Sequence, residues 1–87
     1  MDRKTLSKNF IAYLANSLGE DASEITEKTK ISSLGLDGYD LADIGNSINK
    51  LTWMHGFRID PIKIVGCTTV GKVVDVIAEA CGITNNS

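Results

Sequence analysis

The chain has 87 residues, of which 43% are hydrophobic and 23% charged, and its net charge is −2. This length and composition predict one soluble globular domain near the lower size limit for a self-sufficient core. The weak negative charge excludes a nucleic-acid-binding surface, which requires clustered lysines and arginines. No signal-peptide pattern and no apolar run of about 18 residues is present, so we expect a cytoplasmic protein without a membrane segment.

The sequence contains two cysteines, Cys67 and Cys81, and one histidine, His55. A helix over 68–81 would hold the thiols roughly 20 Å apart, whereas a disulfide requires Cα atoms within about 7 Å. We therefore expect two separate thiols, as in a reducing cytoplasm. No residue spacing is typical of a metal site, and no combination of nucleophile, base and orienting group indicates an enzyme.

The first predicted element is a helix over 3–18, with Asp2 as its N-cap and Gly19 just past its end. Apolar residues recur through it at spacings of three and four, which is typical of one buried face. They are Leu6, Phe10, Ile11, Leu14 and Leu18. The connection over 19–36 is long for a compact domain, so we expect four apolar residues to hold it on the core. They are Ile25, Ile31, Leu34 and Leu36.

A second helix is predicted over 38–52, with Asp37 as its N-cap and Asp40 completing a carboxylate version of the capping box. Its buried seam repeats at positions i, i+3, i+7 and i+10. The seam consists of Leu41, Ile44, Ile48 and Leu51. Gly45 interrupts this helix at a cost on the order of 1 kcal/mol relative to alanine. We therefore expect a packing reason for Gly45, such as the close approach of another helix.

Asp60 followed by Pro61 predicts the start of a short helix over 61–65, because proline suits the first helical position after a capping side chain. A last helix is predicted over 69–81, capped by one of two adjacent threonines and closed by a glycine. Those residues are Thr68, Thr69 and Gly82. Its inward face consists of Val70, Val73, Val74, Ile77 and Cys81.

These elements predict the all-α class: a four-helix bundle with a short third helix and a long first loop. One domain would cover 1–87, with 84–87 as a mobile tail. Between the second and third helices we expect Trp53 to be a partly buried lid on the bundle and His55 to be a turn residue.

Three segments, in this order and spacing, resemble the acyl carrier protein family over nearly the whole chain. They are ISSLGLD (31–37), FRID (57–60) and TTVGKVVDVI (68–77). The first is similar to the family's loop before its attachment serine, the second to the entry to its short third helix, and the third to its fourth helix. The resemblance implies a four-helix bundle of the acyl-carrier-protein type.

The family attaches 4'-phosphopantetheine to a serine at the start of the second helix, where free backbone N–H groups favour a phosphate. Here Asp37 matches the family's aspartate, and Gly38 stands where the serine would be. Glycine has no hydroxyl, so we expect the chain as written to carry no phosphopantetheine arm. The sequence leaves open whether Gly38 is natural or introduced.

The resemblance also implies a docking face for enzymes of fatty-acid, polyketide or nonribosomal-peptide biosynthesis, such as a synthase, an acyltransferase or a phosphopantetheinyl transferase. Carried over position by position, that face is Tyr39, Asp40, Ala42, Asp43, Asn46, Asn49 and Lys50. An acyl-chain cavity would be lined by Leu41, Ile44, Ile48, Val65 and Val70. The protein is expected to be a monomer. Two alternatives stay open: an interaction or regulatory adaptor, and a small helical lipid binder.

Overall fold

A computed structural model of the chain describes residues 2–54 and 56–83. Its helices are α1 (Arg3–Leu18), α2 (Gly38–Ile48) and α3 (Val70–Ala80), and the described residues contain no strand. Short 3-10 turns occupy the connections at Ala22–Glu24, Ile31–Leu34, Thr52–Met54 and Pro61–Lys63. The predicted all-α class is therefore confirmed for this part of the chain. None of its helices combines the length and apolarity needed to cross a bilayer.

Three sequence expectations fall outside the described residues. They concern His55, the tail over 84–87, and the side chain of Trp53.

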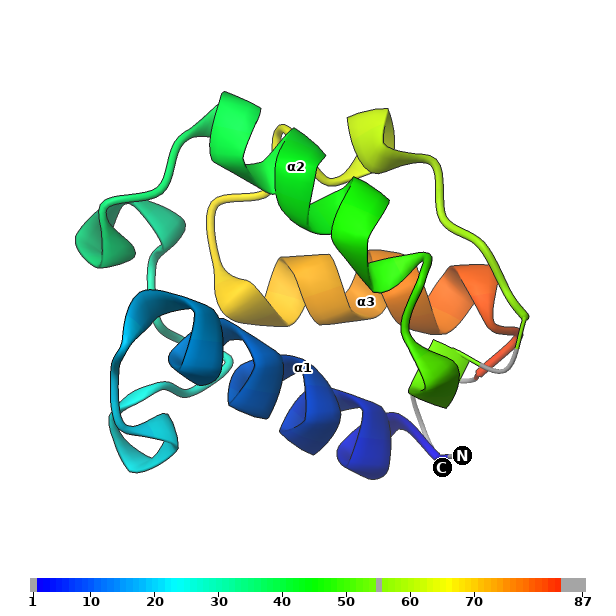
Figure 1. Cartoon of the computed structure of the whole chain (residues 1–87), viewed down its shortest axis with the longest axis horizontal. Coiled ribbons are helices and arrows are strands. Elements are labelled where there is room, and N and C mark those ends of the chain that lie inside the picture. The colour runs from blue at the N-terminus through cyan, green and yellow to red at the C-terminus, as the bar shows by residue number, and fades with distance from the viewer. Residues whose placement is uncertain (1, 55, 84–87) are drawn as a thin grey trace.

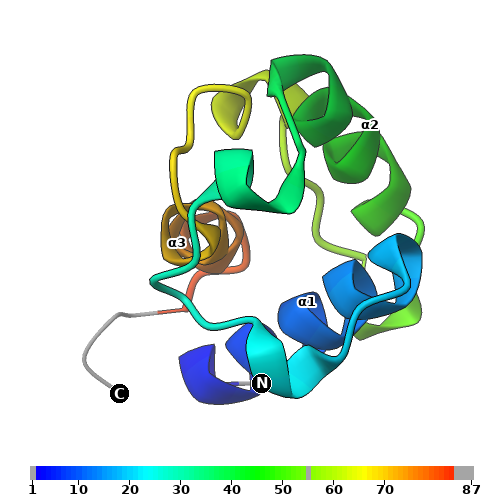
Figure 2. The same ribbon diagram turned by 90° about the vertical axis from the view of Figure 1, so that its left-hand side faces the viewer.

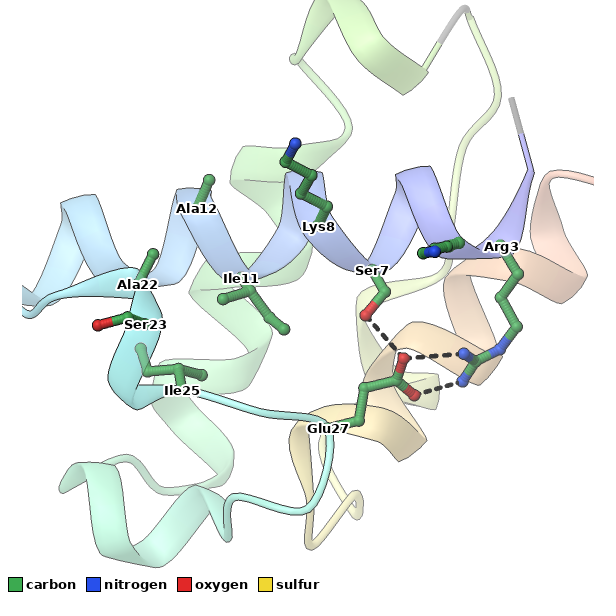
Figure 3. Close-up of a pocket in the computed structure, with 10 residues that line it drawn as sticks. Arg3, Ser7, Lys8, Ile11, Ala12, Ala22, Ser23, Ile25 and Glu27 are labelled. Carbon is green, nitrogen blue, oxygen red and sulfur yellow. Dashed lines mark hydrogen bonds and ion pairs between the residues drawn. The ribbon is translucent and has the colours of Figure 1, made fainter.

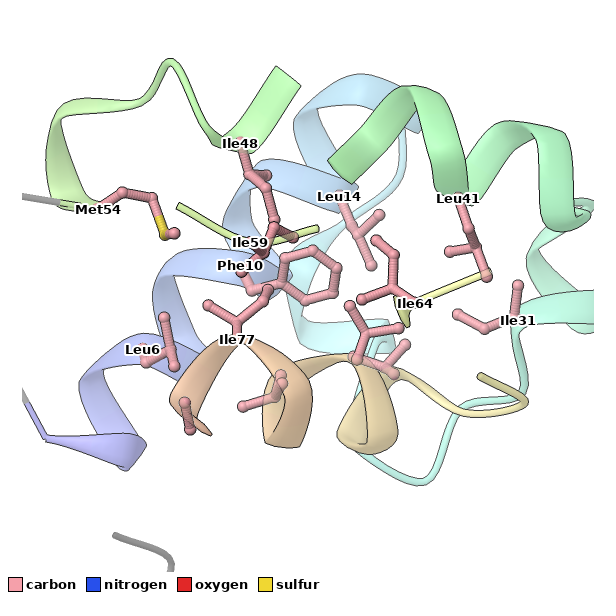
Figure 4. Close-up of a cluster of buried hydrophobic side chains, with 14 of the residues drawn as sticks. Leu6, Phe10, Leu14, Ile31, Leu41, Ile48, Met54, Ile59, Ile64 and Ile77 are labelled. Carbon is pink, nitrogen blue, oxygen red and sulfur yellow. The ribbon is translucent and has the colours of Figure 1, made fainter. Parts of the chain in front are cut away.

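The three α-helices surround one hydrophobic core. α1 packs against α3, while α2 packs against the Pro61–Lys63 turn on another side of the molecule (Figure 1). Seen from one end, the helices stand at the corners of a triangle (Figure 2). The close-up of the core in Figure 4 shows side chains from all three converging between them. The large side chains that are fully buried are Leu6, Phe10, Leu14, Leu41, Ile48, Met54, Ile64, Val70, Val73, Val74 and Ile77.

Polar caps set the helix ends where the sequence predicts them. The Asp2 carboxylate accepts from the Thr5 N–H at 2.8 Å at the start of α1. Gly19 ends that helix with a φ of 69°, a left-handed conformation that glycine adopts without the cost of a Cβ. The Thr69 hydroxyl accepts from the Lys72 N–H at 3.3 Å, so Thr69 rather than its neighbour caps α3.

The long first connection is held on the core as expected. Ile25 and Ile31 are buried, and Leu34 and Leu36 pack partly buried against them. Its backbone is also tied to the start of α3, because the Ile31 N–H donates to the Thr68 carbonyl at 2.9 Å.

The prediction that the second helix continues to residue 52 is wrong, because α2 ends at Ile48. The next residue, Asn49, uses its side-chain amide to hold the backbone of Ile59, ten residues further on. The chain then leaves the helix axis and bends through a 3-10 turn that brings Met54 into the core, fully buried. The side-chain bonds of Asn49 and the burial of Met54 together end the helix earlier than the spacing of apolar residues predicts.

The predicted third helix over 61–65 is a single 3-10 turn, Pro61–Lys63. Its start is as expected, because the Asp60 carboxylate accepts from the Ile62 N–H at 3.1 Å. After this turn Ile64 is fully buried. The chain must then reach Thr68, whose carbonyl is bonded to the first connection, and this leaves no room for a second helical turn. The described residues thus hold three α-helices rather than four.

Candidate docking surface on α2

The N-terminus of α2 carries a closed capping box. The Asp37 Oδ1 accepts from the Asp40 N–H at 3.0 Å, and the Asp40 Oδ2 accepts from the Asp37 N–H at 2.9 Å. The predicted carboxylate pair is confirmed. These two carboxylates hold the helix start and also place negative charge at its positive dipole end, which is stabilising.

Gly38, the first residue of α2, packs against Val65. A Cβ added to Gly38 would lie 3.0 Å from the Val65 Cγ1 and 3.6 Å from its carbonyl oxygen. The tighter contact is with the end of a half-buried side chain, so a shift of Val65 by a few tenths of an ångström would relieve it. Serine at this position would therefore strain the helix start slightly.

The residues at this helix start do not fit a phosphopantetheine attachment. Gly38 offers no hydroxyl. Ser32 and Ser33 lie in the preceding 3-10 turn rather than at the helix start, and the Ser33 hydroxyl donates to the Lys30 carbonyl at 2.7 Å. Neither serine substitutes for the residue that the family uses.

A small cavity of about 170 Å³ opens beside Gly38. Of the five residues expected to line an acyl cavity, Leu41 and Val65 do so, whereas Ile44, Ile48 and Val70 do not. The cavity is smaller than the roughly 300–1,000 Å³ typical of ligand pockets. This size does not favour the lipid-binder alternative at this place.

Cys67 also lines this cavity, and neither it nor Cys81 forms a disulfide. Burial raises the pKa of both thiols, which keeps them protonated near neutral pH. A protonated thiol is a poor nucleophile, so burial lowers the reactivity of Cys67. The expectation of two separate thiols is confirmed.

Tyr39, Asp43 and Asn46 face solvent from one stripe of α2, at positions i, i+4 and i+7, and Lys50 is exposed in the turn that follows the helix. All four side chains are exposed, and Tyr39 stands out at 87% because it is large and aromatic. Among the described residues none of the four has an ion pair or hydrogen bond through its side chain. Two other residues of the predicted docking face, Asp40 and Ala42, are half-buried.

Asn49, also predicted to contact a partner, is tied inward. Its Oδ1 accepts from the Ile59 N–H at 2.8 Å and its Nδ2 donates to the Ile59 carbonyl at 2.9 Å. Both ends of the amide are therefore occupied by one backbone. No sequence pattern signals a bond of this kind across ten residues.

The Pro61–Lys63 turn lies directly on α2 at Gly45. A Cβ added to Gly45 would lie 2.9 Å from both the Cα and the Cβ of Pro61. The expected close approach is confirmed, although the approaching element is a turn rather than a helix. The turn also carries Ile62, which is 74% exposed and is not among the residues of the predicted docking face.

Comparison with known proteins finds no matching family model, no matching curated protein and no matching solved structure. Within the described residues, no group of three or more histidines, cysteines and acidic residues is arranged to hold a metal ion.

Proposed function

We propose that this chain is an acyl-carrier-like module that docks on enzymes of an acyl-transfer pathway through α2 without carrying a phosphopantetheine arm. The observation that carries the proposal is the exposed stripe of α2, which begins at a capped helix N-terminus where Gly38 replaces the attachment serine. The element order supports it as well, because a short turn, Pro61–Lys63, stands between α2 and α3 where carriers have their short third helix.

The acidic residues toward the N-terminal end of α2 favour a basic partner. Asp43 is exposed and forms no ion pair with the described residues, and the carboxylates of Asp37 and Asp40 lie at the same end of α2. Charges that are not neutralised within their own chain steer association and fix the orientation of the complex. Tyr39 adds an exposed aromatic surface, the kind of side chain that is enriched at interfaces.

The decisive experiment is to supply the missing hydroxyl. We expect the Gly38→Ser protein, incubated with a broad-specificity phosphopantetheinyl transferase and coenzyme A, to gain the mass of one phosphopantetheine group. The unchanged chain should gain nothing, and neither should Gly66→Ser, which places a serine where an added Cβ would meet no other atom within 4 Å. Modification of the unchanged chain would show that the carrier alignment is wrong.

The adaptor alternative is favoured by the contact between Gly38 and Val65, because a glycine used for close packing suits a protein that has no need of the hydroxyl. The same experiment separates the two functions. A Gly38→Ser protein that keeps its helical circular dichroism and yet stays unmodified would replace the carrier-like proposal by the adaptor.

The docking face is tested in the Gly38→Ser background. Asp43→Lys should slow charging by the transferase and weaken the dependence of its rate on salt. Glu79→Lys makes the same charge change at an exposed position of α3 and should leave the rate unaltered. Equal rates for both variants would place the interface away from α2.

A further inference from the structure

A second surface, away from α2, has its own chemistry. A groove of about 630 Å³ lies between α1 and the segment 22–27 (Figure 3). Ser7 and Ile11 point from α1 toward that segment, while Lys8 and Ala12 lie on the outer edge of the helix. Small and apolar side chains therefore line the middle of the groove, and basic side chains line one of its edges.

The groove is a positive region of a negative protein. Three basic residues line it, Arg3, Lys4 and Lys8, against one acidic residue, Glu27. Asp75, outside the groove, also pairs with Arg3, so the local formal charge is +1 in a chain whose net charge is −2. Glu27 is already satisfied: Arg3 donates to its two carboxylate oxygens at 2.9 and 2.7 Å, and the Ser7 hydroxyl donates to it at 2.7 Å.

The two lysines, by contrast, have no partner among the described residues. Lys4 and Lys8 are exposed, one helical turn apart, and form no ion pair there. Because Arg3 holds Glu27 in place, that carboxylate does not reach across to neutralise them. The ammonium groups of Lys4 and Lys8 therefore lie along one edge of an apolar floor, which Ile11 and Ile25 form.

We propose that this groove is a docking site for an acidic amphipathic segment of a partner protein, with apolar side chains on Ile11 and Ile25 and carboxylates beside Lys4 and Lys8. Half of the lining residues are exposed, so the groove contacts an occupant on one side only. A small ligand needs most of its surface buried, whereas an amphipathic helix lays only its apolar face into a groove.

Small side chains allow such a segment to approach closely. Ala12 and Ala22 stand exposed on the two sides of the groove, one on α1 and one on the first 3-10 turn. The groove runs beside α1 from Arg3 to Ala12, so a partner helix of about three turns would find contacts along its length. The proposal does not depend on the carrier-like function, because the groove and the α2 stripe share no residue.

The probe is a fluorescein-labelled synthetic peptide of about 14 residues, with leucines at helical spacing and glutamates elsewhere. Its affinity for the full chain is measured by anisotropy, and its position is mapped by amide shifts of the 15N-labelled protein. We expect shifts in 3–12 and 22–27 and none in α2. A peptide of the same composition with scrambled leucines should bind much more weakly, because it presents no apolar face.

Lys4→Glu/Lys8→Glu should weaken binding by at least about tenfold, since both favourable charges are reversed. Glutamate suits the first turns of a helix, so α1 should persist, which circular dichroism checks. Lys63→Glu/Lys72→Glu makes the same charge change at two exposed positions outside the groove and should leave the affinity unchanged. An equal loss in both variants would show general charge attraction and overturn the proposal.

Three other outcomes would also overturn it. Equal binding of the scrambled peptide would show that the apolar floor does not contribute to the affinity. Shifts on these amides with sodium laurate, without any effect of the peptide, would assign the groove to a lipid carboxylate. Shifts that depend on protein concentration alone, and vanish in Lys4→Glu/Lys8→Glu, would make a second copy of this chain the occupant.

Discussion

The two sides of this small domain are held together by different interactions. On the α1–α3 side, Arg3 bridges Glu27 of the first connection and Asp75 of α3, with its Nη2 at 2.7 and 2.6 Å from their carboxylates. On the α2 side the described residues form no ion pair. There the close contacts are between Gly45 and Pro61 and between Asn49 and the backbone of Ile59.

This difference separates the contacts that stabilise the fold from the charges that stay exposed. On the α1–α3 side the charges of Arg3, Glu27 and Asp75 are used within the chain, so acid acts on that side through these ion pairs. The α2 side is held by packing and neutral hydrogen bonds, which leaves its charged stripe free for another molecule. Charge changes on α2 should therefore alter binding more than folding, whereas changes at its buried contacts should alter folding.

The largest effect is expected in the core beneath α2. Ile48 is fully buried, and Ile48→Ala should lower the free energy of unfolding by about 2–5 kcal/mol, through lost transfer energy and a residual cavity. Ile62→Ala is the matched control, because Ile62 is 74% exposed and should cost little. Urea denaturation followed by circular dichroism measures both. Similar losses would contradict the packing that places Ile48 inside and Ile62 outside.

A smaller effect is expected at Asn49. Asn49→Ala removes both bonds to Ile59 and leaves a half-buried N–H and carbonyl without partners, at a cost of about 1–3 kcal/mol. Asn46→Ala, one turn earlier and exposed, should stay within about 0.5 kcal/mol of the unchanged protein. If the two variants unfold alike, Asn49 does not have the structural role assigned here and regains its place in the docking face.

Gly45 tests the backbone contact on the same side. Gly45→Ala would gain about 1 kcal/mol of helix propensity, but its Cβ must displace Pro61, and overpacking of this kind costs about 1–3 kcal/mol. We expect a net loss of stability in thermal unfolding. Gly66→Ala, with open space around its Cβ and an ordinary φ, should be neutral or slightly stabilising. A stabilised Gly45→Ala would rule out close packing at Pro61.

Local patterns in the sequence predict the helices and their caps because those features depend on neighbouring residues. Asp2, Asp37 and Thr69 each cap through a bond to a backbone N–H three residues away. Spacing likewise predicts the burial of Leu41 and Ile48 in α2, although Leu51 of the same predicted seam lies beyond the end of the helix. Even the contact at Gly45 is foreseeable, since a mid-helix glycine needs a packing reason.

What the sequence does not reveal depends on residues far apart. Arg3 meets Asp75 across 72 positions, and Asn49 meets Ile59 across ten. No periodic pattern encodes such pairs. The groove beside α1 has no sequence signal for a related reason: two exposed lysines one helical turn apart are typical of any solvated helix face, and only the fold places the segment 22–27 beside Lys4 and Lys8.

The smallest effect, and the one that isolates the α1–α3 side, comes from Glu27→Gln. The hydrogen bond from Arg3 is the main cause that holds the pKa of Glu27 below its ordinary value of 4.5, with the Ser7 hydroxyl adding to it and burial opposing it. Glu27 keeps part of its surface in water, so we expect a loss of only about 1 kcal/mol at neutral pH.

The lowered pKa of Glu27 determines how its contribution to stability changes with pH. Glu27 stabilises the fold fully above its unfolded pKa, near 4.5, and this contribution is lost as the pH falls through the lower folded value. The difference in thermal midpoint between the unchanged chain and Glu27→Gln should therefore be constant near neutrality and shrink below pH 4.5. Glu79→Gln, at an exposed residue without an ion pair among the described residues, should show little difference at any pH. A Glu27→Gln difference that persists unchanged in acid would mean that the contact acts through its shape and hydrogen bonds rather than through charge.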